Sequence, residues 1–275
     1  MAISVSPVSL INKHSGKTTD KLLQELMSVS EGMGICWLGN IGWLLYAENK
    51  LIAFDLDLLD DLRINPSPIS LKAIASRLDV HFVTHEHDDH FNQATSEVLA
   101  QHSDCLFVIP EFCRPKAERI RIPDERIVIA TPNEPFEIKG IDVHPIPAMH
   151  GHKKFTIVFR SPHTYKGCGY KIRLAGKVIM QPGDSVLLLE HLEQTDVNVL
   201  FVSPTVHNMY IDRSSVLIQE IKPDYTFPQH FGTYKQNEKN EYWTKGYPDE
   251  LYNVLPEEFK RRYHKLEQGQ IFLIR

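Results

Sequence analysis

The fold of this chain is decided by the stretch Val83-Thr84-His85-Glu86-His87-Asp88-Asp89-His90-Phe91. Six consecutive residues of it, 85–90, contain three histidines and two aspartates that could bind a metal ion. The apolar run at residues 80–83 directly precedes them and is typical of a buried strand. A helical pattern resumes at about Gln93. We therefore expect the cluster on a loop at the carboxyl end of a strand, where open α/β sheets place their ligand sites.

The spacing of these side chains indicates metal chemistry. Neutral imidazole and carboxylate are the usual ligands of zinc and of its first-row neighbours. His85 and His87 are two apart on a turn, so both can point at one metal, while Asp89 and His90 can turn towards a second. The alternative is a solvated polar loop that happens to be rich in histidine. Such a loop needs none of these residues, whereas metal binding needs most of them.

The motif His85-x-His87-x-Asp89-His90 resembles the signature of the metallo-β-lactamase superfamily. The resemblance implies a four-layer αββα sandwich, in which two sheets pack face to face with helices outside. The order of strands and helices, taken without the resemblance, indicates only the α/β class. Trp37-Leu38-Gly39, followed by a strand that ends in Asp55, is also similar to the opening β-hairpins of that superfamily.

Length and composition describe an ordinary globular protein. The 275 residues are enough for one large domain or two small ones. We expect an N-terminal arm and helix over residues 1–33 and a single hydrolase-like domain over residues 34–275. The net charge of −5 argues against nucleic acid as a partner. No apolar run reaches the length of a membrane span, so we expect no membrane partner.

The cysteine content indicates the cellular compartment in which the protein is expected. None of the four forms a Cys-x-x-Cys pair, which argues against a zinc ribbon or a thioredoxin-like motif. Four cysteines in so long a chain favour free thiols in a reducing environment. The N-terminus shows no basic region followed by an apolar core, so no signal peptide is expected. We predict a cytoplasmic protein that acts on a small molecule, with self-association into a homo-oligomer left open.

Periodicity predicts the secondary structure. Helices are expected from a cap at residues 18–20 to Met27 and at 71–78, 93–102, 111–119, 214–221 and 248–266. Strands are expected at 35–38, 43–47, 51–55, 80–83, 106–109, 127–130, 136–139, 141–146, 155–160, 169–174, 178–180, 198–203, 225–227 and 270–274. Among these, we predict that the strand 155–160 pairs with the strand 169–174.

The resemblance implies further metal ligands downstream. The superfamily places its third metal-binding histidine in a context like Pro147-Ala148-Met149-His150, which implicates His150. A carboxylate after glycine at a strand end matches its bridging aspartate, which implicates Asp184. His230 corresponds to the last ligand. Its setting, Pro228-Gln229-His230-Phe231-Gly232-Thr233, is similar to the branch that contains L-ascorbate-6-phosphate lactonase (the UlaG-like proteins).

Other polar residues near these positions are further candidates for the site, and several of them have an alternative reading. Asp55 is either an acid beneath the metals that orients a ligand imidazole or an ordinary strand-end acid. His144 fits a packed or surface histidine, and His152 would line the pocket. Substrate contacts are expected at His207, Asn208, Lys153, Lys154 and Thr233, and for His207 and Asn208 an ordinary polar pair on a loop is the alternative reading. For the lysines, here including Lys166, ordinary solvated side chains are the alternative reading.

The resemblance then implies a binuclear hydrolase. One metal is expected on His85, His87 and His150, and the other on Asp89, His90 and His230, with Asp184 bridging. No cysteine sits beside Asp184, so the second metal would have only oxygen and nitrogen ligands. The expected cofactors are two divalent ions, Mn²⁺ or Zn²⁺ first and Fe²⁺ as a third candidate. A hydroxide that bridges the metals would attack a carbonyl carbon or a phosphorus, with Asp89 and Asp184 as the catalytic carboxylates.

The expected reaction is the opening of a lactone or the cleavage of an ester, with phosphorylated sugar acids among the substrates. A phosphodiesterase on the same binuclear site is the alternative. Two readings lie outside this class. One is a non-catalytic binding protein on the same fold, which the complete ligand set disfavours. The other is a redox di-iron protein, whose branch of the superfamily carries an acid where this chain has His87.

Overall fold

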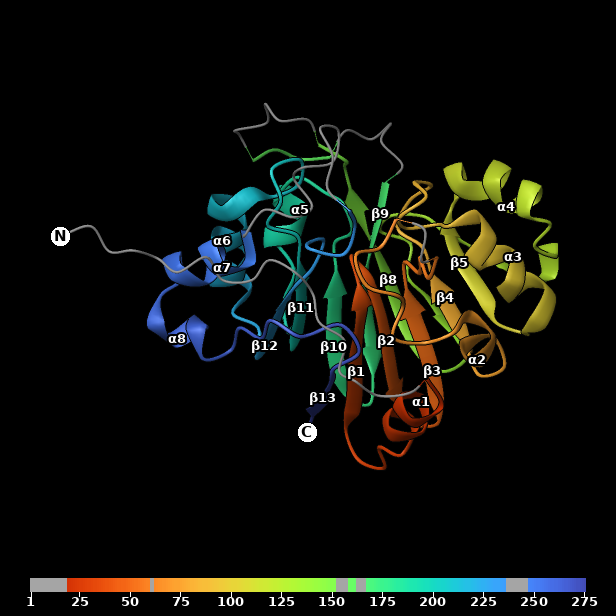
Figure 1. Ribbon diagram of the computed structural model, residues 1–275. Coiled ribbons are helices and arrows are strands. Elements are labelled where there is room, and N and C mark those ends of the chain that lie inside the picture. Colours follow the sequence, from red (N-terminus) through yellow and green to blue (C-terminus); the bar gives the residue numbers. More distant parts are fainter. Residues whose placement is uncertain (1–18, 60–61, 152–157, 162–166, 236–246) are drawn as a thin grey trace.

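Two β-sheets packed face to face form the centre of the molecule, and helices cover the outer face of each (Figure 1). The computed structural model describes residues 19–59, 62–151, 158–161, 167–235 and 247–275. The expected four-layer αββα arrangement is confirmed, with both sheets of mixed strand direction.

The first sheet has the order β13-β1-β2-β3-β4-β5-β6. Its strands are β1 (Met33–Gly39), β2 (Gly42–Ala47), β3 (Lys50–Phe54), β4 (Val80–Phe82), β5 (Leu106–Pro110), β6 (Ile127–Ala130) and β13 (Ile271–Ile274). β13, β1, β2 and β3 are antiparallel neighbours, whereas β3 to β6 run parallel. The parallel half therefore presents its carboxyl ends together at one edge.

The second sheet has the order β12-β11-β10-β9-β8-β7. Its strands are β7 (Phe136–Ile138), β8 (Ile141–Ala148), β9 (Gly167–Leu174), β10 (Lys177–Gln181), β11 (Val199–Val202) and β12 (Tyr225–Pro228). β7 to β10 are antiparallel, and β10, β11 and β12 run parallel. This sheet thus repeats the plan of the first.

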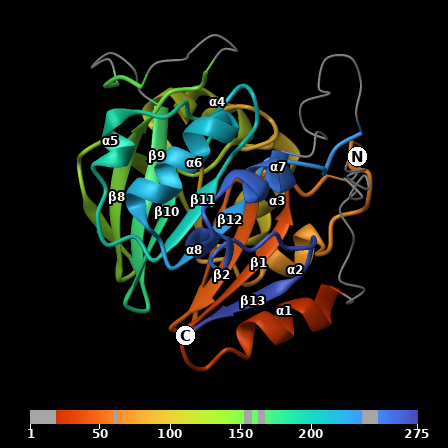
Figure 2. The same cartoon turned by 90° about the vertical axis from the view of Figure 1, so that its left-hand side faces the viewer.

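Helices from the two halves of the chain cover different sheets (Figures 1 and 2). The first sheet is covered by α1 (Thr19–Met27), α2 (Leu71–Ala75), α3 (Gln93–His102) and α4 (Arg114–Ile120). The second sheet is covered by α5 (Leu189–Leu192), α6 (Tyr210–Ile221), α7 (Tyr247–Val254) and α8 (Glu257–Lys260). Leu22 of α1 and Leu217 of α6 are among the apolar side chains that each layer buries against its sheet.

Large aromatic side chains fill the space between the sheets. Phe54 and Phe82 come from the first sheet, and Phe227 comes from the second. The rings of Trp43 and Phe201 meet across the interface with centroids 4.4 Å apart. Such side chains bury large apolar areas and pack in few orientations. The interface therefore fixes how the strand ends of one sheet face those of the other.

The pairing of the predicted strand 155–160 is wrong. β9 lies between β8 and β10 and has no free edge for a third strand. Residues 155–157 lie outside the described residues, and Phe159 instead forms a parallel bridge with Leu188. The long β8, which runs to Ala148, takes the edge that the prediction gave to 155–160.

The C-terminal helix prediction over residues 248–266 is also too long. The chain forms two short helices there, α7 and α8, and Pro256 stands between them as the N-cap of α8. Proline has no N–H to continue the first helix and disfavours helical backbone at the preceding residue. Among the described residues, no helix has both the length and the apolar character needed to cross a membrane.

Candidate metal centre

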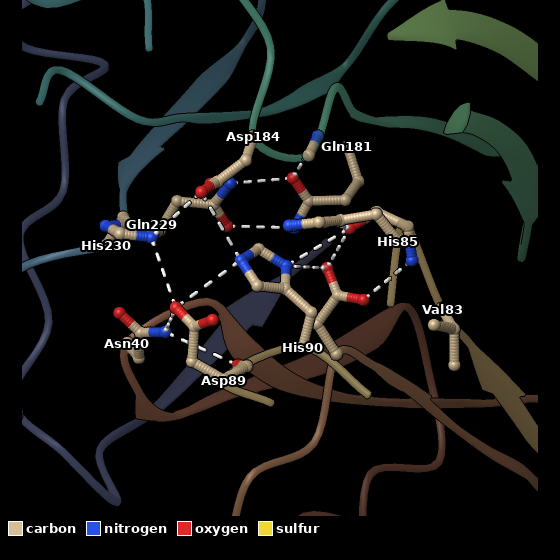
Figure 3. A network of polar contacts seen from close by, with 12 residues as sticks. Asn40, Val83, His85, Asp89, His90, Gln181, Asp184, Gln229 and His230 are labelled. Carbon is tan, nitrogen blue, oxygen red and sulfur yellow. Dashed lines mark hydrogen bonds and ion pairs between the residues drawn. The ribbon is translucent and has the colours of Figure 1, made fainter. Parts of the chain in front are cut away.

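Polar side chains from four loops meet at one edge of the sandwich, and Figure 3 shows those from the loops after β4, β10 and β12. The loops follow β4, β8, β10 and β12, which carry strand-end residues of both sheets. All seven expected ligands belong to the groups that this edge brings together: His85, His87, Asp89, His90, His150, Asp184 and His230. The arrangement arises because parallel strands place their carboxyl ends on the same side.

The signature loop is a tight turn held from outside. The backbone N–H groups of His90 and Phe91 both donate to the carbonyl of His87, at 3.0 and 2.8 Å. Asn92 then caps α3, since its Oδ1 accepts a hydrogen bond from the Thr95 N–H at 2.9 Å. Lys116 of α4 stabilises the exposed part of this loop, because its Nζ donates a hydrogen bond to the Glu86 carbonyl at 2.6 Å.

Among the described residues, four overlapping groups of three side chains have the spacing of metal ligands, and two of these match the expected sets. The ligand atoms of His85, His87 and His150 all lie within 4.8 Å of one another. The same limit holds for Asp89, His90 and His230. These are the two sets that the sequence assigned to two separate metals. Imidazole and carboxylate at such distances suit one first-row cation in each set.

Asp184 connects the two sets. Its Oδ2 lies 3.1 Å from Nε2 of His230, 3.4 Å from Nε2 of His90 and 3.6 Å from Nε2 of His150. The other carboxylate oxygen, Oδ1, accepts a hydrogen bond from Nδ2 of Asn208 at 3.0 Å. Asn208 therefore holds the carboxylate so that one oxygen faces both sets of imidazoles.

The ring nitrogens of His85 test whether a metal fits. Its Nδ1 is 3.2 Å from the hydroxyl of Thr84. Its Nε2 is buried and has no hydrogen-bond partner among the described residues. A buried polar atom without a partner carries an energetic penalty, and such atoms are uncommon in native proteins. Because this atom lies within the ligand set, a cation is the partner that fits it.

Asp55 lies beneath the cluster and contacts a ligand histidine. Its Oδ2 is 3.1 Å from Nδ1 of His90 and accepts a hydrogen bond from the Thr84 hydroxyl at 2.8 Å, while its Oδ1 accepts one from the Thr84 backbone N–H, also at 2.8 Å. Burial raises the pKa of Asp55, although His90 and the Thr84 hydrogen bonds oppose the rise. The contact turns the Nε2 of His90 towards Asp89 and Asp184, as metal binding requires.

Charge is balanced inside the cluster by protons on histidine. Burial acts to raise the pKa of Asp89 and of Asp184, but His90 and His230 more than offset it, so both pKa values fall below the usual range. Burial acts to lower the pKa of His230, yet Asp184 and Asp89 raise it to about 9. The pKa of His90 is raised by the same carboxylates, against its own burial. Without a metal, the two imidazolium ions are thus the counter-charges of the two carboxylates.

Asn40 supports the second set, although it was not among the site residues expected from the sequence. Its Nδ2 donates to Oδ2 of Asp89 at 3.2 Å, and its carbonyl accepts the backbone N–H of His230 at 2.8 Å. His230 has a positive φ of 64°, an unfavourable backbone conformation for a residue with a Cβ. The Asn40 contact holds it there. The only sequence signal was an asparagine between Gly39 and Gly42 in a β-hairpin turn.

Two buried glutamines next to ligand positions were also missed. Gln181 lies three residues before Asp184, and Gln229 directly precedes His230. Both are completely buried, and Nε1 of Trp43 donates to Oε1 of Gln229 at 2.8 Å. Polar residues at the ends of apolar strands were the signal, but the partner of each came from a distant part of the chain.

The expected substrate residues lie in three kinds of place. His207 is at the cluster, with Nε2 3.5 Å from Oδ2 of Asp184. Asn208 and Thr233 are each 1% exposed, and each is engaged by protein groups. The Thr233 hydroxyl accepts the N–H of Asn40 and donates to the carbonyl of Phe231, so it lies under the site. Lys153 and Lys154, the remaining expected contacts, lie outside the described residues, as do His152 and Lys166.

His144 stands apart from the cluster. It lies within β8, opposite Lys171 of β9, and is partly exposed. Burial and the nearby lysine lower its pKa. Among the described residues, the metal-ligand groups at this edge do not include it. Its expected reading as a packed or surface histidine agrees with this position.

Comparisons with known proteins agree with the fold. A protein-family model described as a β-lactamase superfamily domain matches residues 55–231. A UPF0173 metal-dependent hydrolase of Saccharolobus solfataricus is 30% identical over 115 residues, which are 42% of this chain and 49% of that relative. The match thus spans about half of the relative's length. A UPF0173 metal-dependent hydrolase of Pelotomaculum thermopropionicum is 24% identical over 216 residues, covering 74% of this chain and 86% of that protein.

A solved structure supports the fold separately. Igni18, described as a metallo hydrolase of Ignicoccus hospitalis, matches 88% of this chain and 98% of its own with a TM-score of 0.69, at 16% identity. The family match begins at Asp55 and ends at Phe231, so it includes all seven residues of the cluster. The chain belongs to the metallo-β-lactamase superfamily.

Proposed function

We propose that this chain is a metal-dependent hydrolase with two divalent cations. The observation that carries the proposal is the pair of three-residue ligand sets joined by one carboxylate, Asp184. His85, His87 and His150 would hold one cation, and Asp89, His90 and His230 the other. When bound, such a pair supplies Lewis-acid polarisation of the substrate and lowers the pKa of a water molecule.

The chain's own carboxylates have distinct tasks in this proposal. Asn208 fixes Oδ1 of Asp184, which leaves Oδ2 towards both ligand sets. Asn40 fixes Oδ2 of Asp89. The pKa of Asp89 stays below its usual range because the neighbouring histidines outweigh the effect of burial. Asp89 is therefore ionised and would accept the proton of the attacking water.

Among the described residues, the first ligand set is the more exposed of the two, and we expect the substrate to enter on that side. His90 and His230 are 0% and 1% exposed. The side chain of His150 is 31% exposed, and His87 is also exposed. A carbonyl or phosphoryl group would thus approach from the side of the first set. The deeper second set would lie behind it, screened from solvent.

The ligand chemistry narrows the metals. Both sets consist of imidazole and carboxylate, and the four cysteines are buried elsewhere as free thiols. Such sets suit Mn²⁺, Zn²⁺ or Fe²⁺. For the substrate, we propose a lactone or an ester, with phosphorylated sugar acids as the first class to test. A phosphodiester is the second candidate, because the same arrangement serves phosphoryl centres. The names of the curated relatives, both metal-dependent hydrolases, support hydrolysis in general.

The test is proton release by the Mn²⁺-reconstituted protein. Sugar-acid lactones, phosphorylated and plain, would be compared with a phosphodiester, and His87→Ala would serve as the matched control. Turnover of a lactone that His87→Ala abolishes supports the lactonase assignment. Phosphodiester cleavage alone would move the assignment to phosphodiesterase. Equal rates in both proteins would show that hydrolysis does not occur at this site.

A further inference from the structure

The side chain of His207 lies against three residues of the metal cluster. Its Nε2 is 3.5 Å from Oδ2 of Asp184. Its ring is stacked on the ring of His150, with centroids 5.7 Å apart, and meets the ring of His230 edge-on at 4.9 Å. The side chain is only 13% exposed. The imidazole therefore faces the other ligands rather than open solvent.

The backbone holds His207 in this position. The N–H of Asn208 donates to the carbonyl of Thr205 at 3.0 Å, so residue 207 is inside a tight turn. Gly151, directly after His150, allows the two loops to meet. A Cβ at residue 151 would lie 2.7 Å from the carbonyl oxygen of His207, closer than protein atoms tolerate. The turn and the glycine together place His207 beside His150.

The result is that one of the four groups with the spacing of metal ligands contains His207. The ligand atoms of His150, Asp184 and His207 all lie within 4.8 Å of one another. Two imidazoles and one carboxylate are a full set of protein ligands for a first-row cation that keeps water in its remaining positions. We propose that these three residues form a third cation position, on the outer side of the proposed pair.

The third position takes His150 from the first set, because one imidazole nitrogen binds one cation, and it shares Asp184 with the pair, so the inference rests on the proposed function. Sharing predicts an order of binding. The first two cations meet ligands of their own in addition to Asp184, whereas the third has only His207 to itself. Cations a few ångströms apart also repel each other. We therefore expect the third cation to bind at least about tenfold more weakly than the first two.

The consequence is a response to excess metal. A cation bound at His207 draws His150 and Asp184 away from the pair and occupies the partly exposed side of the cluster. It would thus compete both for the ligands and for the space through which the substrate enters. His207 acts in this inference as a metal ligand, not as a contact of the substrate.

The experiment counts bound cobalt. The metal-free full chain is dialysed against rising concentrations of Co²⁺, and bound cobalt per chain is measured for the wild type, His207→Gln and His144→Gln. His144 is the matched control, because it is a partly exposed histidine outside the cluster. We expect two cations at low Co²⁺ and a third at higher Co²⁺ for the wild type and His144→Gln. His207→Gln should stop at two, with its third uptake weakened at least about tenfold.

Two results would overturn the inference. One is a wild type that stops at two cations, and the other is a third uptake that His207→Gln leaves unchanged. Failure of the pair is distinguishable, since it appears as fewer than two cations at low Co²⁺ and as no loss in His87→Ala. If His207→Gln fails to fold, wild-type crystals soaked in Co²⁺ decide. An anomalous peak between His150, Asp184 and His207 supports the third position, and its absence at saturating Co²⁺ rejects it.

Discussion

Gln181 and Gln229 form a reciprocal amide pair: each Nε2 donates to the Oε1 of the other, at 2.8 and 2.7 Å. Figure 3 shows the pair beside Asp184. Trp43 of the first sheet donates to the same Gln229 oxygen at 2.8 Å. The pair thus connects the end of β10 to the loop after β12, and connects both to the opposite sheet.

Gln229→Leu should destabilise the protein by about 2–4 kcal/mol, because it leaves buried donors of Trp43 and Gln181 without partners. Urea unfolding of the metal-free protein measures the change. In Gln181→Leu/Gln229→Leu the loss should be smaller than the sum of the two single losses, since neither glutamine then leaves the other unpaired. Gln93→Ala, at an exposed helical position, is the control and should change stability by less than about 0.5 kcal/mol. Additive losses would show that the two glutamines act independently.

His87→Ala should remove one bound cation and most of the turnover while leaving the fold intact. His87 is exposed, so its loss opens no cavity in the core. Metal analysis and circular dichroism of the reconstituted variant check both halves of the expectation. His144→Ala, from the strand that leads to His150, should bind metal as the wild type does. Two tightly held cations in His87→Ala would mean that the first set is misassigned.

Metal binding should release protons at neutral pH. The pKa of His230 is raised to about 9 by Asp184 and Asp89, which outweigh its burial, so it must lose a proton before its nitrogen can bind a cation. Affinity should therefore rise with pH up to about 9. Calorimetry at pH 7.5 in two buffers of different ionisation enthalpy counts the protons. The contribution of His230 should vanish near pH 10, and no proton release at pH 7.5 would contradict the charge balance described here.

The raised pKa of His230 also makes the metal-free protein less stable at alkaline pH. The folded-state pKa of about 9 lies above the ordinary value of 6.5, so this contribution to stability is complete below pH 6.5 and is lost as pH rises through about 9. Its size is on the order of 3 kcal/mol, at about 1.36 kcal/mol per unit of pKa shift. Urea unfolding at pH 6.5 and pH 10 measures it. His230→Gln should show a smaller difference between the two pH values.

Gly183→Ala should lower both stability and metal affinity. Gly183 has a φ of +66°, and a Cβ there would lie 2.9 Å from Cβ of Thr84, the residue that anchors Asp55. Gly176→Ala is a close control, because Gly176 has a φ of +68° but no heavy atom within 4 Å of the added carbon. Both variants should lose about 1 kcal/mol to backbone strain. Only Gly183→Ala should also weaken cobalt binding, and an equal effect of both on binding would argue against the steric cause.

The local parts of the site could be predicted from the sequence, whereas its supports could not. The cluster from His85 to His90 is contiguous, and its neighbours show a strand before it and a helix after it. His150, Asp184 and His230 came from short motifs that resemble those of the superfamily. Asn40 is different, because its contact with Asp89 spans 49 positions in the chain. Nothing in the neighbourhood of either residue marks the other.

The same reason explains the errors in the fold. Residues 155–160 have the composition of a strand, but β8 takes the neighbouring position beside β9, and this competition is settled only by packing. The glutamine pair is also long-range, since Gln181 and Gln229 are 48 positions apart. Patterns of residues describe what each segment can do alone. They do not say which of several suitable segments pairs with a given strand.

The position of β13 has a consequence for how the chain is made. β13 (Ile271–Ile274) completes the first sheet by pairing with β1 (Met33–Gly39), about 230 residues earlier in the sequence. During synthesis, β1 therefore emerges from the ribosome long before its outer partner exists. An uncovered strand edge is a template for pairing with other chains. Until the last strand is released, the growing protein must keep that edge away from its neighbours, and a chain cut short before Ile271 would never cover it.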